Sequence, residues 1–264
     1  CVMLRGNGPK AFCAGGDVVQ LVNQCREQPG EIPALARRFF ADEYRLDHLI
    51  HTYPKPLICW AHGHVLGGGM GLMQGAGIRI VTPSSRLGMP EINIGLYPDV
   101  GGSWFLARLP GRLGLFLGLT AASINARDAL DLNLADRCLR DDQQDALLEG
   151  LVQLNWREQA DLQLHSLLRA LENEATPELP AAQWLPRRER IDELLDLADL
   201  PAAFQAIIAL QQGTVDMAAN WWNDEQESNL LRMSRKGMVK AEDFRIIFSD
   251  QHLLEAYPTC RRQF

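Results

Sequence analysis

Paired cysteines, long apolar runs and an excess of basic residues are all missing from this sequence. Its six cysteines are scattered without a CxxC pair, which argues against both a disulfide framework and a zinc site. No run approaches the roughly eighteen apolar residues of a membrane helix, and the first residues lack a signal-peptide pattern. The net charge of -7 disfavours a broad surface for nucleic acid or anionic lipid. We therefore expect a soluble, cytoplasmic protein with neither nucleic acid nor membrane as its partner.

The chain has 264 residues, 47% of them hydrophobic, which is enough to bury a large core. Short apolar runs alternate with helical patterns over residues 1–140, and this alternation predicts an α/β fold. Expected strands cover residues 2–4, 56–61 and 78–81, and expected helices begin near Asp17, Pro33, Gly68, Gly102 and Ala126.

The pattern changes after Asp141, and residues 141–222 are predicted to form a helical region. Within it, Leu147, Leu151 and Leu154 recur at helical spacing, and the proline-rich residues 176–190 are expected to connect helical pieces. Residues 223–264 are polar with weak periodicity, so we predict no particular structure for this C-terminal segment.

Two glycine clusters each follow a strand-like run and precede a helical pattern: AFCAGGD at 11–17 and GHVLGGGMG at 63–71. Glycine lets the backbone turn tightly there and present amide N–H groups to a ligand. Neither cluster fits GxxxxGK[ST], nor GxGxxG with a later acidic residue, so a nucleotide-binding loop is disfavoured. Two interpretations stay open, namely an oxyanion hole built from two loops and tight packing between strand and helix.

Two acids, Glu91 and Asp99, lie in GMPEINIGLYPDVGG among apolar residues, glycine and proline. Burying charged groups without partners is costly, so they are candidates for one shared pocket. The structural alternative is that Glu91 caps a helix and Asp99 is the N-cap of the helix that follows it.

A third acid, Glu43, falls on the apolar stripe of the helix expected after Pro33, which runs through Leu35, Phe39, Leu46 and Ile50. It is either a functional acid or the partner of an arginine such as Arg37 or Arg45. His62 and His64 alternate as on a strand face, but no third ligand accompanies them, so we expect no metal.

Taken in order, AFCAGGD, GHVLGGGMGL and MPEINIGLYPDVGGSWFLARLPG resemble the crotonase superfamily, also called the enoyl-CoA hydratase/isomerase family. The resemblance covers residues 1–140 and implies a spiral of ββα units with a helical C-terminal region. It also implies an acyl-CoA-binding core whose oxyanion hole consists of the Gly16 and Gly68 amides. Only ten residues precede Ala11, so we expect this core to lack the N-terminal strands of the family.

The acids refine the resemblance. Hydratases of the family carry a catalytic glutamate where this chain has Gly71, whereas Glu91 matches their second glutamate. FFADEY, GGGMGL and MPEINIGLYPDVGG resemble the 3-hydroxyisobutyryl-CoA hydrolase subgroup, which cleaves a thioester in valine degradation. The resemblance implies substrate contacts at Ala14, Glu43, Gly68, Glu91 and Asp99. Of these, Glu91 and Asp99 would be catalytic together with the amides of Gly16 and Gly68.

This reading predicts an acyl-CoA thioester hydrolase without a metal or separate cofactor, because coenzyme A is part of its substrate. Glu91 would attack the thioester or activate water, Asp99 would orient Glu91 or the substrate hydroxyl, and Glu43 would recognise that hydroxyl or tune the other acids. The alternatives are an enoyl-CoA isomerase or hydratase, and a non-catalytic acyl-CoA-binding paralogue. The family also suggests a homotrimer or homohexamer.

Overall fold

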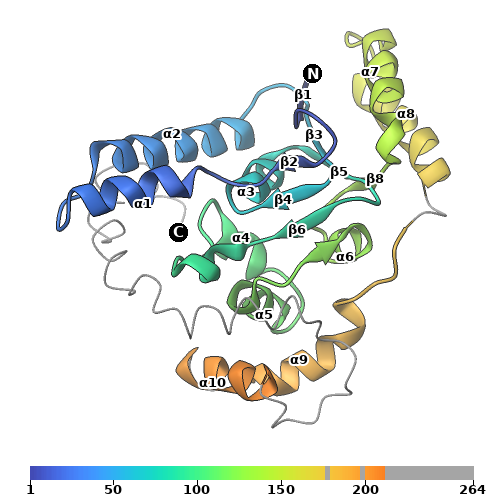
Figure 1. Cartoon of the computed structure of the whole chain (residues 1–264). Coiled ribbons are helices and arrows are strands. Elements are labelled where there is room, and N and C mark those ends of the chain that lie inside the picture. The colour runs from blue at the N-terminus through green and yellow to red at the C-terminus, as the bar shows by residue number, and fades with distance from the viewer. Residues whose placement is uncertain (176–178, 197–199, 212–264) are drawn as a thin grey trace.

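The computed structural model describes residues 1–175, 179–196 and 200–211, and they form two four-stranded sheets surrounded by helices (Figure 1). The predicted C-terminal segment 223–264 lies outside the described residues. The first sheet is parallel throughout, in the order β1 (Val2–Arg5), β3 (Leu57–Ala61), β5 (Ile78–Val81), β8 (Arg137–Cys138). The second has the order β2 (Ala11–Cys13), β4 (His64–Leu66), β6 (Arg86–Gly88), β7 (Ile124–Asn125), with β7 antiparallel.

Successive pairs of strands wind through both sheets, which explains the strand order. In each of the pairs β1–β2, β3–β4 and β5–β6, the first strand joins the first sheet and the second joins the second sheet. A helical segment then leads to the next pair. The chain is thus a spiral of ββα units, as the resemblance implied, and successive turns bring their connecting loops side by side.

The connecting helices follow the expected starting points closely. The helices of the first 140 residues are α1 (Val18–Glu27), α2 (Ala34–His51), α3 (Gly68–Gly75), the 3₁₀ helix η1 (Pro90–Ile94), α4 (Gly102–Leu106), α5 (Leu113–Thr120) and α6 (Ala126–Asp131). Asp17 is the N-cap of α1 because its carboxylate accepts a hydrogen bond from the Gln20 N–H at 3.1 Å. The sequence pattern therefore located the starts of α1, α2, α3, α4 and α6 to within one residue, whereas η1 and α5 were not expected.

The C-terminal helices pack against both the sheet and the core. They are η2 (Asp141–Gln143), α7 (Gln144–Gln153), α8 (Ala160–Ala175), η4 (Leu185–Arg187), α9 (Arg188–Leu195) and α10 (Leu200–Gln211). Alternating residues of β3 face opposite sides of its sheet, and Ile58 and Trp60 pack with Leu147 and Leu151 of α7. The helical pair α7–α8 therefore covers one face of the first sheet, while α9 and α10 lie beside α5 (Figure 1). Among the described residues, no helix is long and apolar enough to cross a membrane.

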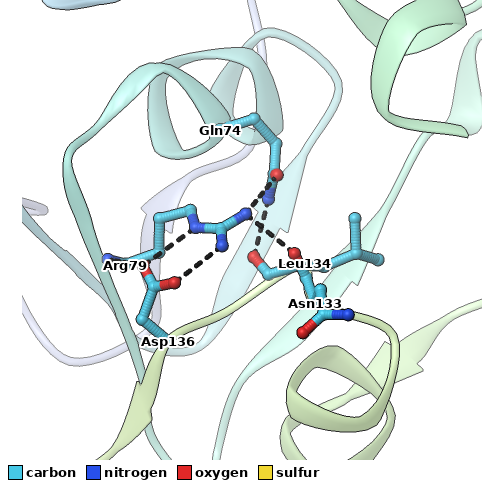
Figure 2. A network of polar contacts seen from close by, with 5 residues as sticks. All are labelled: Gln74, Arg79, Asn133, Leu134 and Asp136. Atoms are coloured by element: carbon cyan, nitrogen blue, oxygen red, sulfur yellow. Dashed lines mark hydrogen bonds and ion pairs between the residues drawn. The ribbon is translucent and has the colours of Figure 1, made fainter. Parts of the chain in front are cut away.

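A polar network around Arg79 fixes α3 against the sheet (Figure 2). The Arg79 guanidinium of β5 donates two hydrogen bonds to Asp136, at 2.7 and 3.0 Å, and further ones to Gln74 of α3 and to the Asn133 carbonyl oxygen. Gln74 in turn donates to the Leu134 carbonyl oxygen at 2.7 Å. Burial raises the pKa of Asp136, but hydrogen bonds and charge from Arg79 outweigh it and hold that pKa below its ordinary value. The C-terminal end of α3 is therefore anchored, and its other end begins the candidate site.

Candidate active site

Glu43, Glu91 and Asp99 come from three separate segments and lie close together. Glu43 is on α2, Glu91 on η1, and Asp99 precedes α4; Asp99 raises the pKa of each of the other two. Two of these acids face the start of α3. A Cβ atom added at Gly67 would lie 2.6 Å from Glu91 Oε1, and one added at Gly68 would lie 2.4 Å from Glu43 Oε1. A side chain at either position would therefore displace the carboxylate beside it, and Gly67 also has a φ of 55°, which favours glycine.

Helix α2 places Glu43 on its buried side, although the predicted stripe needs correction. Leu46 is 45% exposed, because the buried face runs through Ala36, Glu43 and Ile50 and leaves Leu46 at its margin. The arginine interpretation of Glu43 is also wrong. Arg45 pairs with Asp42 at 3.0 Å on the exposed side of the helix, and no ion pair within the described residues involves Glu43.

Burial makes these carboxyls weaker acids than exposed ones. Desolvation first, and then the negative charge of Asp99, raise the pKa of Glu43 to about 7. Desolvation likewise raises the pKa of Glu91 to about 7, assisted by Asp99 and Glu43 and opposed by a backbone hydrogen bond. Glu91 is only 6% exposed, and its Oε2 atom has no hydrogen-bond partner in the part of the chain that the structure describes. Glu91 therefore has a buried carboxylate oxygen that no described group satisfies.

Tyr44 and Asp47 join this cluster, and the sequence analysis did not select either of them. The Tyr44 hydroxyl donates a 2.6 Å hydrogen bond to Asp99 Oδ2. Burial raises the pKa of Asp99, and this hydrogen bond lowers it in part. Asp47 lies one helical turn after Glu43, and its own pKa is raised to about 7. Spacing relative to Glu43 could have indicated Asp47, since positions four residues apart lie on the same helix face, whereas no such spacing links Glu43 with Tyr44, the next residue.

The capping alternatives for Asp99 and Glu91 are wrong. Helix α4 has Gly101 as its N-cap, without a capping side chain, while the Asp99 carboxylate accepts from Tyr44 instead. Glu91 lies in the first turn of η1, whose N-cap, Met89, likewise has no side-chain hydrogen bond. Both carboxylates are therefore left for the cluster.

Val100 fills the space beside Gly71, where hydratases of the family carry a glutamate. A Cβ atom added at Gly71 would lie 2.4 Å from the Val100 Cβ atom. Val100 has a φ of 43°, which is strained for a β-branched residue. Gly71 therefore leaves room for Val100, whose backbone is strained directly after Asp99. A glutamate at position 71 would have to displace Val100.

The two glycine loops lie next to each other at the start of α3. Residues Ala14 to Gly16 form an exposed loop after β2, and a Cβ atom added at Gly69 would lie 2.3 Å from the Cys13 carbonyl oxygen. Gly68 is the first residue of α3, so its N–H has no carbonyl partner within the helix. Among the described residues, neither this N–H nor that of Gly16 donates a hydrogen bond. The Gly68 N–H is thus a free donor beside Glu43, and the Gly16 N–H is a free donor in the neighbouring loop, beside Phe39 of α2.

The histidine pair does not form a metal site. The ring Nε2 of buried His62 lies 2.8 Å from the Gly8 carbonyl oxygen, whereas His64 is exposed. Across residues 1–175, 179–196 and 200–211, no three His, Cys, Asp or Glu side chains are arranged to hold a metal ion. The acid cluster itself therefore lacks the geometry of a metal centre in this structure.

Comparisons with known proteins agree with the motifs. The enoyl-CoA hydratase/isomerase family model matches residues 1–242. The mitochondrial 3-hydroxyisobutyryl-CoA hydrolase of Danio rerio is 40% identical over 153 residues, which are 58% of this chain and 39% of that protein. Small ribosomal subunit protein mS47 of Neurospora crassa is 40% identical over 157 residues, 60% of this chain and 31% of that protein. The matched stretch spans less than half of either relative.

Solved structures give the same picture for the fold. A carnitinyl-CoA dehydratase from Mycobacterium thermoresistibile has a TM-score of 0.70 and 29% identity, covering 97% of this chain and 70% of that one. An enoyl-CoA hydratase from Rhodobacter sphaeroides has a TM-score of 0.60 and 30% identity, covering 95% and 76%. With its two sheets, its spiral of ββα units and this family match, the chain belongs to the enoyl-CoA hydratase/isomerase family and has the crotonase fold.

Proposed function

We propose that this chain hydrolyses acyl-CoA thioesters, with 3-hydroxyisobutyryl-CoA as its preferred substrate. The observation that carries the proposal is the cluster of Glu43, Glu91 and Asp99 beside the free amide of Gly68, with the free amide of Gly16 in the adjoining loop. Relatives that are named 3-hydroxyisobutyryl-CoA hydrolase support the substrate. The reaction needs no metal and no cofactor beyond the CoA of the substrate. A homo-oligomer in the cytoplasm stays a prediction.

In the proposed mechanism, the thioester oxygen lies between the Gly16 and Gly68 amides, which stabilise the negative charge that develops on it. Glu91 in its ionised form either attacks the carbonyl carbon or removes a proton from the attacking water. The C–S bond then breaks. In the water route, the proton that Glu91 removed passes to the departing thiolate of coenzyme A. In the attack route, Glu91 forms a mixed anhydride that a water molecule hydrolyses, and the thiolate takes up a proton released in that hydrolysis. Asp99, which accepts from Tyr44, orients Glu91 or the hydroxyl of the acyl group. Ala14 lies in the loop after β2, which contacts the thioester in this mechanism.

The hydratase alternative loses support from the space beside Gly71, which Val100 occupies. An isomerase would use Glu91 alone and would leave Glu43 and Asp99 without a role. A non-catalytic role remains the second candidate, because one relative is named as a ribosomal protein. Against it stands the cluster of one buried and two half-buried acids, Glu91 with Glu43 and Asp99, which a purely binding role does not require.

Thiol release distinguishes these candidates. The protein is incubated with 3-hydroxyisobutyryl-CoA, 3-hydroxypropionyl-CoA and unsubstituted acyl-CoA esters, and an enoyl-CoA is tested for isomerisation and hydration. We expect thiol release that is fastest with the two hydroxylated esters. Since they differ by one methyl group, their kcat/KM values should differ by about 10- to 200-fold at most. Isomerisation or hydration without thiol release would overturn the proposal, and inactivity in every assay would favour the binding role.

Tyr44→Phe tests the positioning of Asp99. The substitution removes the 2.6 Å hydrogen bond to Asp99 and should therefore raise the pKa of that carboxyl further. Hydrogen bonds to charged groups contribute about 1.5 to 3 kcal/mol, so kcat should fall about 10-fold or more. Tyr53→Phe is the matched control, because Tyr53 packs against the main core as a partly buried side chain. Equal rates in the two variants would contradict the role of Tyr44.

A further inference from the structure

The two loops that carry the proposed oxyanion donors are held unequally. Gly68 begins α3, a helix whose C-terminal end is anchored by the network around Arg79. Gly16 instead lies in the exposed loop of residues 14–17, and its amide N–H donates no hydrogen bond within the described part of the chain. Exposed loops move more than the elements they connect, whereas a donor that stabilises a transition state has to be fixed beforehand. A contact from elsewhere in the fold is therefore needed to hold Gly16.

The Phe39 ring of α2 makes this contact. A Cβ atom added at Gly16 would lie 2.3 Å from Phe39 Cζ and 3.0 Å from Phe39 Cε2, so the tip of the ring rests directly against the Gly16 backbone. The ring is itself held, because Phe40 meets it edge to face, with the ring centroids 5.1 Å apart and an angle of 85° between the planes. Phe40 also packs against Tyr44, whose hydroxyl donates to Asp99. The tip of Phe39 is thus a fixed surface against the loop.

Phe39 and Glu43 lie one helical turn apart on α2, and each faces one of the two donor residues. The Phe39 ring meets Gly16, and Glu43 Oε1 lies 2.4 Å from the position of a Cβ atom added at Gly68. Side chains four residues apart on a helix are neighbours, with about 5 to 6 Å between their Cβ atoms. Two donors that reach one oxygen at about 3 Å each lie within about 6 Å of each other. The spacing of side chains along α2 therefore matches the spacing that an oxyanion hole needs.

We propose that Phe39 is a positioning residue that acts through Gly16: its ring holds the loop after β2 at the distance from α3 at which the Gly16 and Gly68 amides bind one thioester oxygen. The inference rests on the proposed function, in which that oxygen gains negative charge. The ring carries no group that could attack or exchange a proton, so its contribution is confined to geometry. Its loss should therefore affect the transition state, in which the charge develops, more than the bound ester.

Phe39→Leu tests this role, because leucine is also apolar but lacks the ring atoms that meet Gly16. A misplacement of about 1 Å can reduce a rate about 100-fold, so kcat should fall about 10- to 100-fold while KM changes less than about threefold. Leu35→Ala is the matched control. It shortens another half-buried apolar side chain of α2, one turn before Phe39, which is not among the nearest neighbours of Gly16. Equal kcat values in the two variants would overturn the inference.

Backbone NMR of Gly16 gives a second readout that does not depend on turnover. The protein is prepared with ¹⁵N-labelled glycine, and the Gly16 and Gly68 signals are assigned by their loss in Gly16→Ala and Gly68→Ala. The heteronuclear NOE of the Gly16 amide should fall in Phe39→Leu and keep its wild-type value in Leu35→Ala, while that of Gly68 changes in neither variant.

The two readouts separate this inference from the proposed function. A fall of the Gly16 NOE in a protein without thioesterase activity would refute the proposed function but leave the contact between Phe39 and Gly16 established. An unchanged Gly16 NOE in Phe39→Leu would refute the positioning role itself. If Phe39→Leu does not fold, Phe39→Met also removes the ring and serves in both experiments.

Discussion

Glu91→Gln is expected to reduce kcat for thioester hydrolysis by about 100- to 10,000-fold, which is the range that a positioned acid or base contributes. Glutamine has nearly the same shape but can neither attack the thioester nor accept a proton from water. Binding of the CoA ester should stay within a few-fold of wild type, because the charge removed lies at the reacting carbonyl. Thiol release measures the rate, and isothermal calorimetry with the intact ester measures the binding.

The stability of Glu91→Gln separates a chemical effect from unfolding. Burial raises the pKa of Glu91 in the folded protein above its ordinary value. The ionised form therefore opposes folding, and stability is lost as the pH rises through about 7. Glutamine removes this loss, so the variant should unfold at an equal or higher temperature than wild type at pH 8. Glu149→Gln, at an exposed position of α7, is the control. Near-normal turnover in Glu91→Gln would end the catalytic assignment.

Gly68→Pro is expected to lower kcat about 100- to 1,000-fold below that of Gly68→Ala, since only proline removes the amide N–H. Gly68 is the first residue of α3, a position at which proline is well tolerated in a helix. Loss of an oxyanion donor affects the transition state more than the bound ester, so KM should change less than kcat.

Gly68→Ala is the matched control for this comparison. Either substitution adds a Cβ atom, which would lie 2.4 Å from Glu43 Oε1, so both variants displace the Glu43 carboxylate to a similar degree. Their difference isolates the amide hydrogen. Circular dichroism and thermal unfolding must show that both variants fold. Equal kcat values in the two variants would mean that the Gly68 amide does not stabilise the transition state.

Local sequence patterns were most informative where an element buries a continuous apolar run. Leu57–Ala61 is buried at all five positions, and it was predicted as a strand because parallel strands covered on both faces read as unbroken apolar segments. The strands of the second sheet were missed. His64–Leu66 and Arg86–Gly88 have three residues each, too few to show a period, and their extended state depends on pairing with each other.

The candidate site divides in a similar way. The sequence placed Glu91 and Asp99 among apolar residues and Glu43 on a helix stripe. All three acids were selected because burying a charged group without a partner is unfavourable. Asp47 lies at helical spacing from Glu43, but the sequence does not show how far along α2 this face is buried, and nothing local distinguished Tyr44 from exposed polar residues such as Asp42. Only the packing of α2 against α3 and the loop before α4 determined which side of α2 is buried.

By itself, the sequence determined the class of fold, the starts of five helices of the first 140 residues and the identity of three clustered acids, because burial patterns and glycine positions are local properties of the chain. The tertiary structure decided the rest. It brought Asp99 to the Tyr44 hydroxyl, filled the space beside Gly71 with Val100, and left Asp47 without a partner beneath Glu43. These contacts join segments that are distant in the chain, and such proximity is fixed by how helices and sheets pack, which no local pattern encodes.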